Sequence, residues 1–336
     1  MSCSNVGVSL DNADKLQYAA IEKIQIARMK RIRKSLRAIK IPTIKKDTLD
    51  SLSLSLGPEL DVGRDDALPS CISNTFFAPC DWPLDVLEDR TWHERRYWYD
   101  LGQVRRDPAI LLHYIQATMT WYEECLDRLS NFGPDLWHAY RYVQIYCLLG
   151  HHRTLLTVSS DQLSIKEEIG LSLPYRLFQE RGSIKYYHEY CGMWVMFPAL
   201  ETKLPHVSCI VIDSGVPEDD AILLSEAEAA AALVRYQLRS RTFTNHHTKP
   251  ALIATLLRNQ TARLTQAYFD GKQNKLVLRQ SRTLDVSGPE PSPDAWTLVR
   301  WIASQPVGET RYSAEGVNPT NARGPPPANI APGVLV

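Results

Sequence analysis

The chain lacks the long apolar runs and the paired cysteines of membrane-spanning and disulfide-stabilised proteins. Its longest apolar run is about Gly192–Leu200, well short of the roughly 18 residues that a membrane helix needs. Met1–Leu10 has neither a basic stretch nor a long apolar core, which argues against a secretory signal. The 7 cysteines are odd in number and never form a Cys-x-x-Cys pair. We therefore expect reduced thiols and a soluble protein of the cytoplasm or nucleus.

The short motifs of the common enzyme classes are also missing. Neither phosphate-binding glycine motif, G-x-x-x-x-G-K-[ST] or G-x-G-x-x-G, occurs. Gly170–Pro174 begins like the G-x-S-x-G nucleophile elbow, but its final proline lacks the freedom of glycine. His93-Glu94 and His188-Glu189 begin like a zinc-hydrolase motif, yet neither has the second histidine one turn later. The sequence predicts no cofactor and no metal, and it favours a protein that is not an enzyme.

Charge is balanced overall but unevenly placed. The 336 residues hold 38 basic and 38 acidic side chains, and 44% are hydrophobic, as in ordinary globular proteins. The segment Arg28–Lys46 contains nine Lys or Arg residues and no acid. This distribution indicates a basic segment attached to a mildly acidic body.

The basic segment has the pattern of an amphipathic helix over Asp11–Lys40, closed by Pro42. Its apolar residues recur at 3-4-3 spacing, which places them on one face. They are Met29, Ile32, Leu36 and Ile39. The basic residues that we predict to bind a partner are Arg28, Lys30, Arg31, Arg33, Lys34, Arg37 and Lys40.

Two interpretations of this helix remain open. Its apolar stripe could pack on the protein's own body and leave a solvated basic face. Alternatively, residues 28–46 bind an anionic partner: a nucleic acid or nuclear-import factor, an acidic lipid surface, or a calmodulin-like protein.

The remainder of the chain divides into segments of different composition. Residues 47–79 contain a Leu-Ser alternation interrupted by Gly and Pro, which favours a flexible linker, although Leu52–Leu56 also fits a short edge strand. We expect a globular domain at 80–308 and a disordered tail at 309–336. Pro108–Leu129 and Pro134–Gly150 are predicted helices that form an antiparallel pair.

The second half predicts strands and two capped helices. Tyr186–Leu200 and Val207–Ile212 are β-prone, and a capping box at Ser225–Glu228 opens a helix from Glu226 to about Arg241. Three antiparallel strands and a helix capped by Ser292 follow. The strands are Pro250–Asn259, Thr261–Asp270 and Asn274–Val286. The fold class is therefore α+β, with a mainly antiparallel sheet packed against helices.

One weak enzymatic pattern is Glu201-Thr202-Lys203, which follows a strand-like run as in metal-dependent nucleases. Residues i and i+2 share a strand face, so a carboxylate and a lysine could meet there. However, no upstream aspartate on a paired strand completes the site, and the same acid-x-Lys pattern occurs in the turn Asp270–Lys272. If the protein is an enzyme, its site would lie around Glu189, Glu201 and Lys203.

Four segments of the last quarter follow a pattern that occurs elsewhere. They are Pro250–Ala254, Ala267–Gly271, Lys275–Arg279 and Trp301–Gly308. They resemble small uncharacterised proteins of filamentous ascomycete fungi, in which a strand meander precedes a helix that ends R-[WY]-x-x-S-x-P-V-G. Such proteins have no assigned activity, and some are encoded beside secondary-metabolite genes. The resemblance implies an accessory role in such a pathway and does not extend to the basic helix.

The sequence thus favours a non-enzymatic intracellular interaction or regulatory protein that binds an anionic or protein partner through its N-terminal helix. The alternatives are an accessory protein or enzyme of a fungal secondary-metabolite pathway, or a nuclease-like enzyme around Glu201 and Lys203.

Overall fold

The strand meander predicted near the C-terminus forms the centre of the structure. In the computed structural model, β8 (Ala251–Leu257), β9 (Thr261–Asp270) and β10 (Lys275–Gln280) are antiparallel neighbours. Gln260 and Asn274, at the two turns, have positive φ angles of 51° and 55°, which short hairpin connections require. The structure describes residues 12–63, 75–79, 175–181, 184–196, 204–218, 221–257, 260–287, 292–302 and 304–312.

Further strands extend the meander into an eight-stranded sheet of order β2-β10-β9-β8-β6-β5-β4, with β11 paired to β9. The pairs β10–β2 and β6–β8 are parallel, and the other described pairs are antiparallel. The predicted α+β class with a mainly antiparallel sheet is confirmed. The added strands are β2 (Leu54–Leu56), β4 (Tyr175–Arg181), β5 (Ile184–Met196), β6 (Val207–Asp213) and β11 (Leu284–Asp285).

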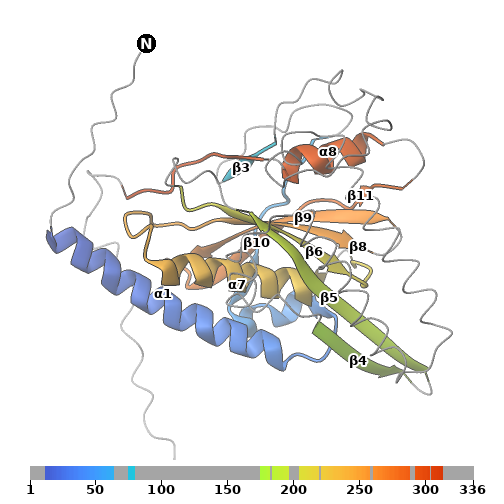
Figure 1. Ribbon diagram of the computed structural model, residues 1–336. Helices are drawn as coiled ribbons and strands as arrows, with labels where there is room; N and C mark the ends of the chain where they lie inside the picture. The colour runs from blue at the N-terminus through green and yellow to red at the C-terminus, as the bar shows by residue number, and fades with distance from the viewer. Residues whose placement is uncertain are drawn as a thin grey trace, which may run out of the picture.

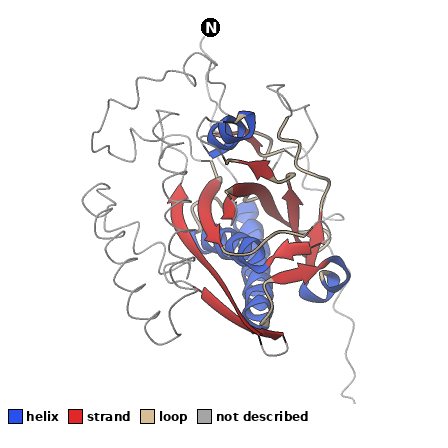
Figure 2. Ribbon diagram, turned by 90° about the vertical axis from the view of Figure 1, so that its right-hand side faces the viewer, coloured by secondary structure: helices blue, strands red, loops and turns tan. Residues whose placement is uncertain are grey.

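Helices cover both faces of this sheet (Figures 1 and 2). Helix α7 (Leu224–Ser240) connects β6 to its parallel neighbour β8, a connection that must cross over the sheet. Helix α1 (Asn12–Ala38) packs on the outer side of α7, and α8 (Pro293–Ile302) lies on the opposite face. None of the helices that the structure describes is long and apolar enough to cross a membrane.

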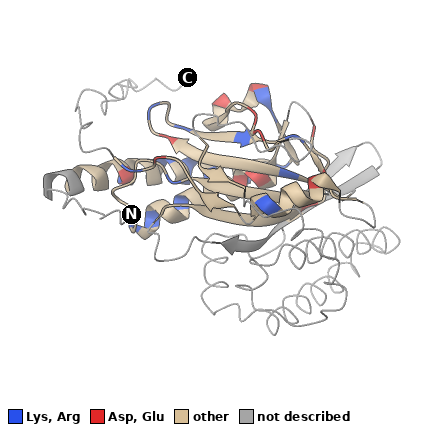
Figure 3. Ribbon diagram, turned by 90° about the horizontal axis from the view of Figure 1, so that it is seen from above, with Lys and Arg blue, Asp and Glu red and all other residues tan. Residues whose placement is uncertain are grey.

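The sheet separates two apolar cores, because successive side chains of a strand point to opposite faces. In β8, Ala251 and Ile253 face α7 and α1, whereas Leu252, Ala254 and Leu256 face α8. Every residue of β6 and β8 is buried. In Figure 3 the long central strands are accordingly drawn mostly in tan, the colour of uncharged residues.

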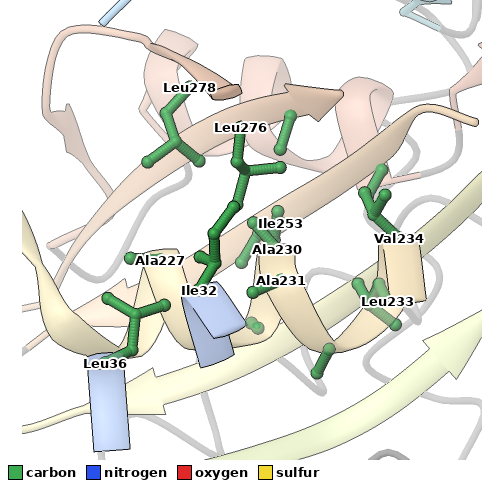
Figure 4. Packing of buried hydrophobic residues seen from close by; sticks show 14 of the residues in the cluster. Ile32, Leu36, Ala227, Ala230, Ala231, Leu233, Val234, Ile253, Leu276 and Leu278 are labelled. Atoms are coloured by element: carbon green, nitrogen blue, oxygen red, sulfur yellow. The ribbon is translucent and has the colours of Figure 1, made fainter. Parts of the chain in front are cut away.

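The contact between α1 and α7 joins the N-terminal helix to the body (Figure 4). Of the four residues of the predicted apolar stripe, Met29, Ile32 and Leu36 are 0–2% exposed, and Ile39 is partly buried against the same core. Opposite them α7 presents small side chains such as Ala230 and Ala231, which let the two helices approach closely. Of the two interpretations of the stripe, internal packing is therefore what the structure shows.

The segment predicted as a linker, residues 47–79, differs from that expectation wherever the structure describes it. Residues Leu54–Leu56 form strand β2 at the edge of the sheet, as the alternative interpretation proposed, and Leu54 is fully buried beside β10. Leu60 and Phe77 are also buried, in the core beneath α8. The reason is that the alternating leucines fill one face of an edge strand, which supplies the continuous apolar surface that a linker lacks.

Two short strand pairs lie outside the eight-stranded sheet. The pairs are β1 (Thr43–Lys45) with β7 (Ala221–Leu223), and β3 (Phe77–Ala78) with β12 (Gln305–Pro306); the 3-10 turns η1 (Lys46–Thr48) and η2 (Asp50–Leu52) lie between β1 and β2. Residues 309–312, which were predicted to belong to a disordered tail, are in contact with the body: Arg311 bridges to His246, and the His247 N–H donates to the Thr310 carbonyl at 2.8 Å. The predicted helix pair at 108–150 and the rest of the tail lie outside the described residues.

The two C-terminal helices begin with different caps. Ser292 caps α8 as predicted, because its Oγ accepts the Ala295 N–H at 3.1 Å. The capping box predicted at Ser225 and Glu228 is shifted: α7 starts at Leu224, directly after β7, and Glu226 accepts the Leu223 N–H at 3.2 Å. The carboxylate of Glu228 is thereby left for a different contact.

We expect Ile32→Ala to destabilise the protein by about 2–5 kcal/mol, because it removes a fully packed side chain between α1 and α7. Urea unfolding of the full chain measures this change. The control is Leu16→Ala on the same helix, where the side chain is 74% exposed and the change should stay within about 0.5 kcal/mol. Equal effects of the two substitutions would contradict the observed orientation of α1.

Candidate functional site

The seven basic residues predicted to bind a partner lie on different sides of the N-terminal helix. Lys30, Arg31 and Lys34 are exposed on its outward side. Lys40 is exposed just after the helix ends, and Arg28 is partly buried. Arg33 is buried, with 7% of its surface exposed, and Arg37 bonds to another helix. The structure therefore divides the predicted set into an outward group and an inward group.

The inward group anchors the C-terminal half of α1. The Arg37 Nε donates to Glu228 Oε1 of α7 at 2.9 Å, and the Tyr190 hydroxyl of β5 donates to the other oxygen of the same carboxylate. Burial, with a smaller contribution from Arg37, lowers the pKa of Arg33 to about 10. Arg33 is buried in the docked helix, whereas Arg37 is bonded to Glu228 and keeps 48% of its side chain exposed.

A second buried ion pair lies where α7 begins. Arg263 of β9 donates twice to Glu226, from Nε at 2.8 Å and from Nη2 at 2.7 Å. The Gln280 side-chain amide donates to the same carboxylate at 2.7 Å. With its two oxygens so occupied, Glu226 fixes the start of α7 over β9 and β10 and has little capacity for a ligand.

A third polar cluster holds the N-terminal half of α1. The Lys249 amine lies 2.7 Å from Glu22 Oε1 and donates to the His246 carbonyl at 2.7 Å. Both side chains of this pair are at most 5% exposed, and burial lowers the pKa of Lys249. The rings of Tyr18 and Tyr312 stack beside the pair with centroids 4.0 Å apart.

Perturbed titratable groups are concentrated in this third cluster, a feature that active sites share. Burial lowers the pKa of His246 to about 3, and the nearby Arg311 and Lys249 charges contribute. Burial also raises the pKa of Tyr312 to about 12. However, the Lys249 amine is enclosed by Glu22 and a backbone carbonyl. The cluster therefore resembles a contact that attaches α1 to the body more than a catalytic site.

The residues of the nuclease-like alternative do not assemble a site that can be described. Glu189 belongs to β5 and stands opposite Arg176 of β4 in the strand register. Glu201 and Lys203 lie outside the described residues. Within the part of the chain that the structure describes, no three His, Cys, Asp or Glu side chains are grouped so that they could hold a metal ion.

The outward face of α1 has members that the basic run alone does not reveal. Lys23 is exposed on the same side as Lys30 and Lys34, seven and eleven residues earlier, yet it precedes the run of nine basic residues. Leu16 and Ile24 are 74% and 66% exposed on this side. Counting helical turns from the buried stripe would have found all three, because residues opposite Met29 and Leu36 must face solvent.

Comparison with known proteins adds no function to this face: no family model, no curated protein and no solved structure matches the chain.

Lowering the pH from 7 to 5 should destabilise the fold, because two buried histidines are held neutral. Burial lowers the pKa of His206 to about 4 and that of His246 to about 3, whereas a histidine in the unfolded chain has a pKa of about 6.5. The unfolded state therefore takes up protons first. The contribution of the pair is complete above about pH 6.5 and is lost as the pH falls towards the folded values.

Over this range the loss is roughly 3 kcal/mol for the pair. Urea unfolding at pH 7, 6 and 5 measures it. The variant His206→Gln, whose amide can replace the ring nitrogen opposite the Val307 carbonyl, should lose about half of the pH dependence. A free energy of unfolding that is constant across this range would show that the histidines are not buried in the neutral form.

Proposed function

We propose that this chain is a non-enzymatic interaction protein that binds an anionic partner through the outward face of α1. The residues of this face that we assign to the anion are its basic ones, Lys23, Lys30, Arg31 and Lys34, all exposed. The observation that carries the proposal is that α1, from residue 16 on, exposes basic side chains on its outward face and buries its acidic one. The single carboxylate between residues 16 and 38 is Glu22, and it is buried against Lys249.

Lys30, Arg31 and Lys34 consequently have no acidic residue within two turns on their own helix. Lys30, Arg31 and Lys34 lie within one and a half turns, so their positive potentials add at the surface. The inner face of α1 is held by the apolar stripe and by Arg37 and Glu22, which fixes the backbone positions from which these basic side chains project. A rigid display of like charge loses little conformational freedom when an anionic surface binds.

We further propose that the protein acts in the cytoplasm or nucleus. Cys209 is a free, fully enclosed thiol in β6, and burial raises its pKa, so it is chemically quiet. The cysteines of the sequence are scattered, which also favours a reducing compartment such as the cytoplasm or nucleus. A role beside fungal secondary-metabolite enzymes stays the expectation that follows from the C-terminal resemblance.

Charge reversal tests the proposal. The double variant Lys30→Glu/Lys34→Glu should weaken binding of fluorescein-labelled poly-glutamate at least about tenfold, because two attractions of about 0.2–1 kcal/mol each become repulsions. Fluorescence anisotropy of the full chain measures the affinity. Binding to the unmodified chain should also weaken between 50 and 300 mM salt, since exposed charges are screened.

The matched control is Lys272→Glu/Arg241→Glu, which changes net charge equally at two exposed positions that are not on α1. This control should bind like the unmodified chain. If both double variants lose affinity to the same extent, or neither does, the outward face is not the binding site.

A further inference from the structure

The outward face carries apolar side chains as well as charge, and these are unusual in the molecule. The four large apolar side chains that stand out as exposed among the described residues are Leu16, Ile24, Ile41 and Val216. Three of them lie on α1 or directly after it. The buried stripe already supplies what α1 needs to dock, so the fold itself does not account for the apolar residues on the other side.

Six exposed residues form a continuous seam along this face. Their spacing is 4-3-4-3-4, the repeat by which one helix keeps the same side towards another. The residues are Leu16, Ala20, Lys23, Ala27, Lys30 and Lys34. We call these six residues the outer seam of α1.

The two halves of the outer seam differ in chemistry. The first half contains Leu16, Ala20 and Lys23, with Ala19 and Ile24 exposed beside them, and is mainly apolar. The second half contains Ala27, Lys30 and Lys34, with Arg31 beside them, and is mainly basic. An occupant of the whole seam must offer apolar contact at one end and negative charge at the other.

We infer that the occupant is an acidic amphipathic helix of another protein, an inference that rests on the proposed function. The alanines of the seam allow a second helix to approach to about 8–10 Å between axes, with Leu16 and Ile24 packed between the two. A helix opposite residues 16–34 needs about 19 residues and is about 28 Å long. Acidic residues are favoured in the first turns of a helix, so an antiparallel partner places its acids against Lys30 and Lys34.

Other anionic surfaces fit the seam less well. Nucleic acid would engage the lysines through its phosphates but would leave Leu16 and Ile24 exposed. Anchoring in a membrane grows with the apolar area that is inserted, and alanines flanking two large side chains provide little. One helix packed on another buries a small interface, so we expect a transient complex of micromolar affinity.

The test uses a synthetic 19-residue helix that carries Glu in its N-terminal half and Leu at the seam-facing positions of its C-terminal half. The full chain should bind it with micromolar affinity in a titration monitored by fluorescence anisotropy. The variant Leu16→Gln/Ile24→Gln should bind at least about tenfold more weakly and should bind poly-glutamate unchanged. The matched control Val216→Gln, at an exposed apolar position outside α1, should bind like the unmodified chain.

The outcomes separate this inference from the proposed function. If the Leu16→Gln/Ile24→Gln variant binds the peptide normally while Lys30→Glu/Lys34→Glu does not, the basic face binds anions but the inference of an amphipathic helical partner is wrong. If Lys30→Glu/Lys34→Glu binds every probe normally, the proposed function itself fails. Tighter binding to phosphatidylserine vesicles or to duplex DNA than to the peptide would show that the partner is that lipid surface or nucleic acid and not a helix.

Discussion

The packing of the apolar stripe of α1 onto α7 determines which side chains of α1 face solvent. Met29, Ile32 and Leu36 are buried against an alanine-rich helix, and each contributes roughly 1.5–3 kcal/mol by its removal from water. Because the helix is docked by this face, the opposite face points to solvent. The basic segment is therefore part of the folded body and not a separate arm.

Polar contacts at both ends of α1 fix its rotation about its own axis. Near the C-terminal end, Arg37 meets Glu228 on α7, and near the N-terminal end Glu22 meets Lys249. Glu228, Glu22 and Lys249 are buried, and each has an opposite charge within hydrogen-bond distance, which offsets the cost of burying an ion. A helix held in this way presents the same side chains to solvent at all times, so the outer seam of α1 is a defined surface.

Local patterns in the sequence were sufficient for the central sheet and for one helix cap. The meander at 250–286 and the cap at Ser292 depend on contacts between near neighbours, which alternation and capping residues reveal. The start of α7 was misplaced because Glu228 looks like a capping residue, whereas it bonds to Arg37, 191 residues away. Glu22 and Lys249 lie even farther apart in the chain, so no local pattern could pair them.

The predicted set of partner-binding residues took no account of how the helix is rotated about its own axis. A run of basic residues indicates net charge but not rotation, so Arg33 and Arg37 were assigned to a partner although they contact the body. Lys23 was omitted because it stands outside the run. Rotation follows once the apolar stripe is taken as the buried side, which is why the docking of α1 is the central claim.

Amide hydrogen exchange of the full chain tests that claim most directly. If α1 is docked, the amides of residues 29–36 should exchange as slowly as those in the middle of α7, because both helices then open only with the core. Exchange within seconds, as in an isolated helix, while α7 remains protected would contradict the account.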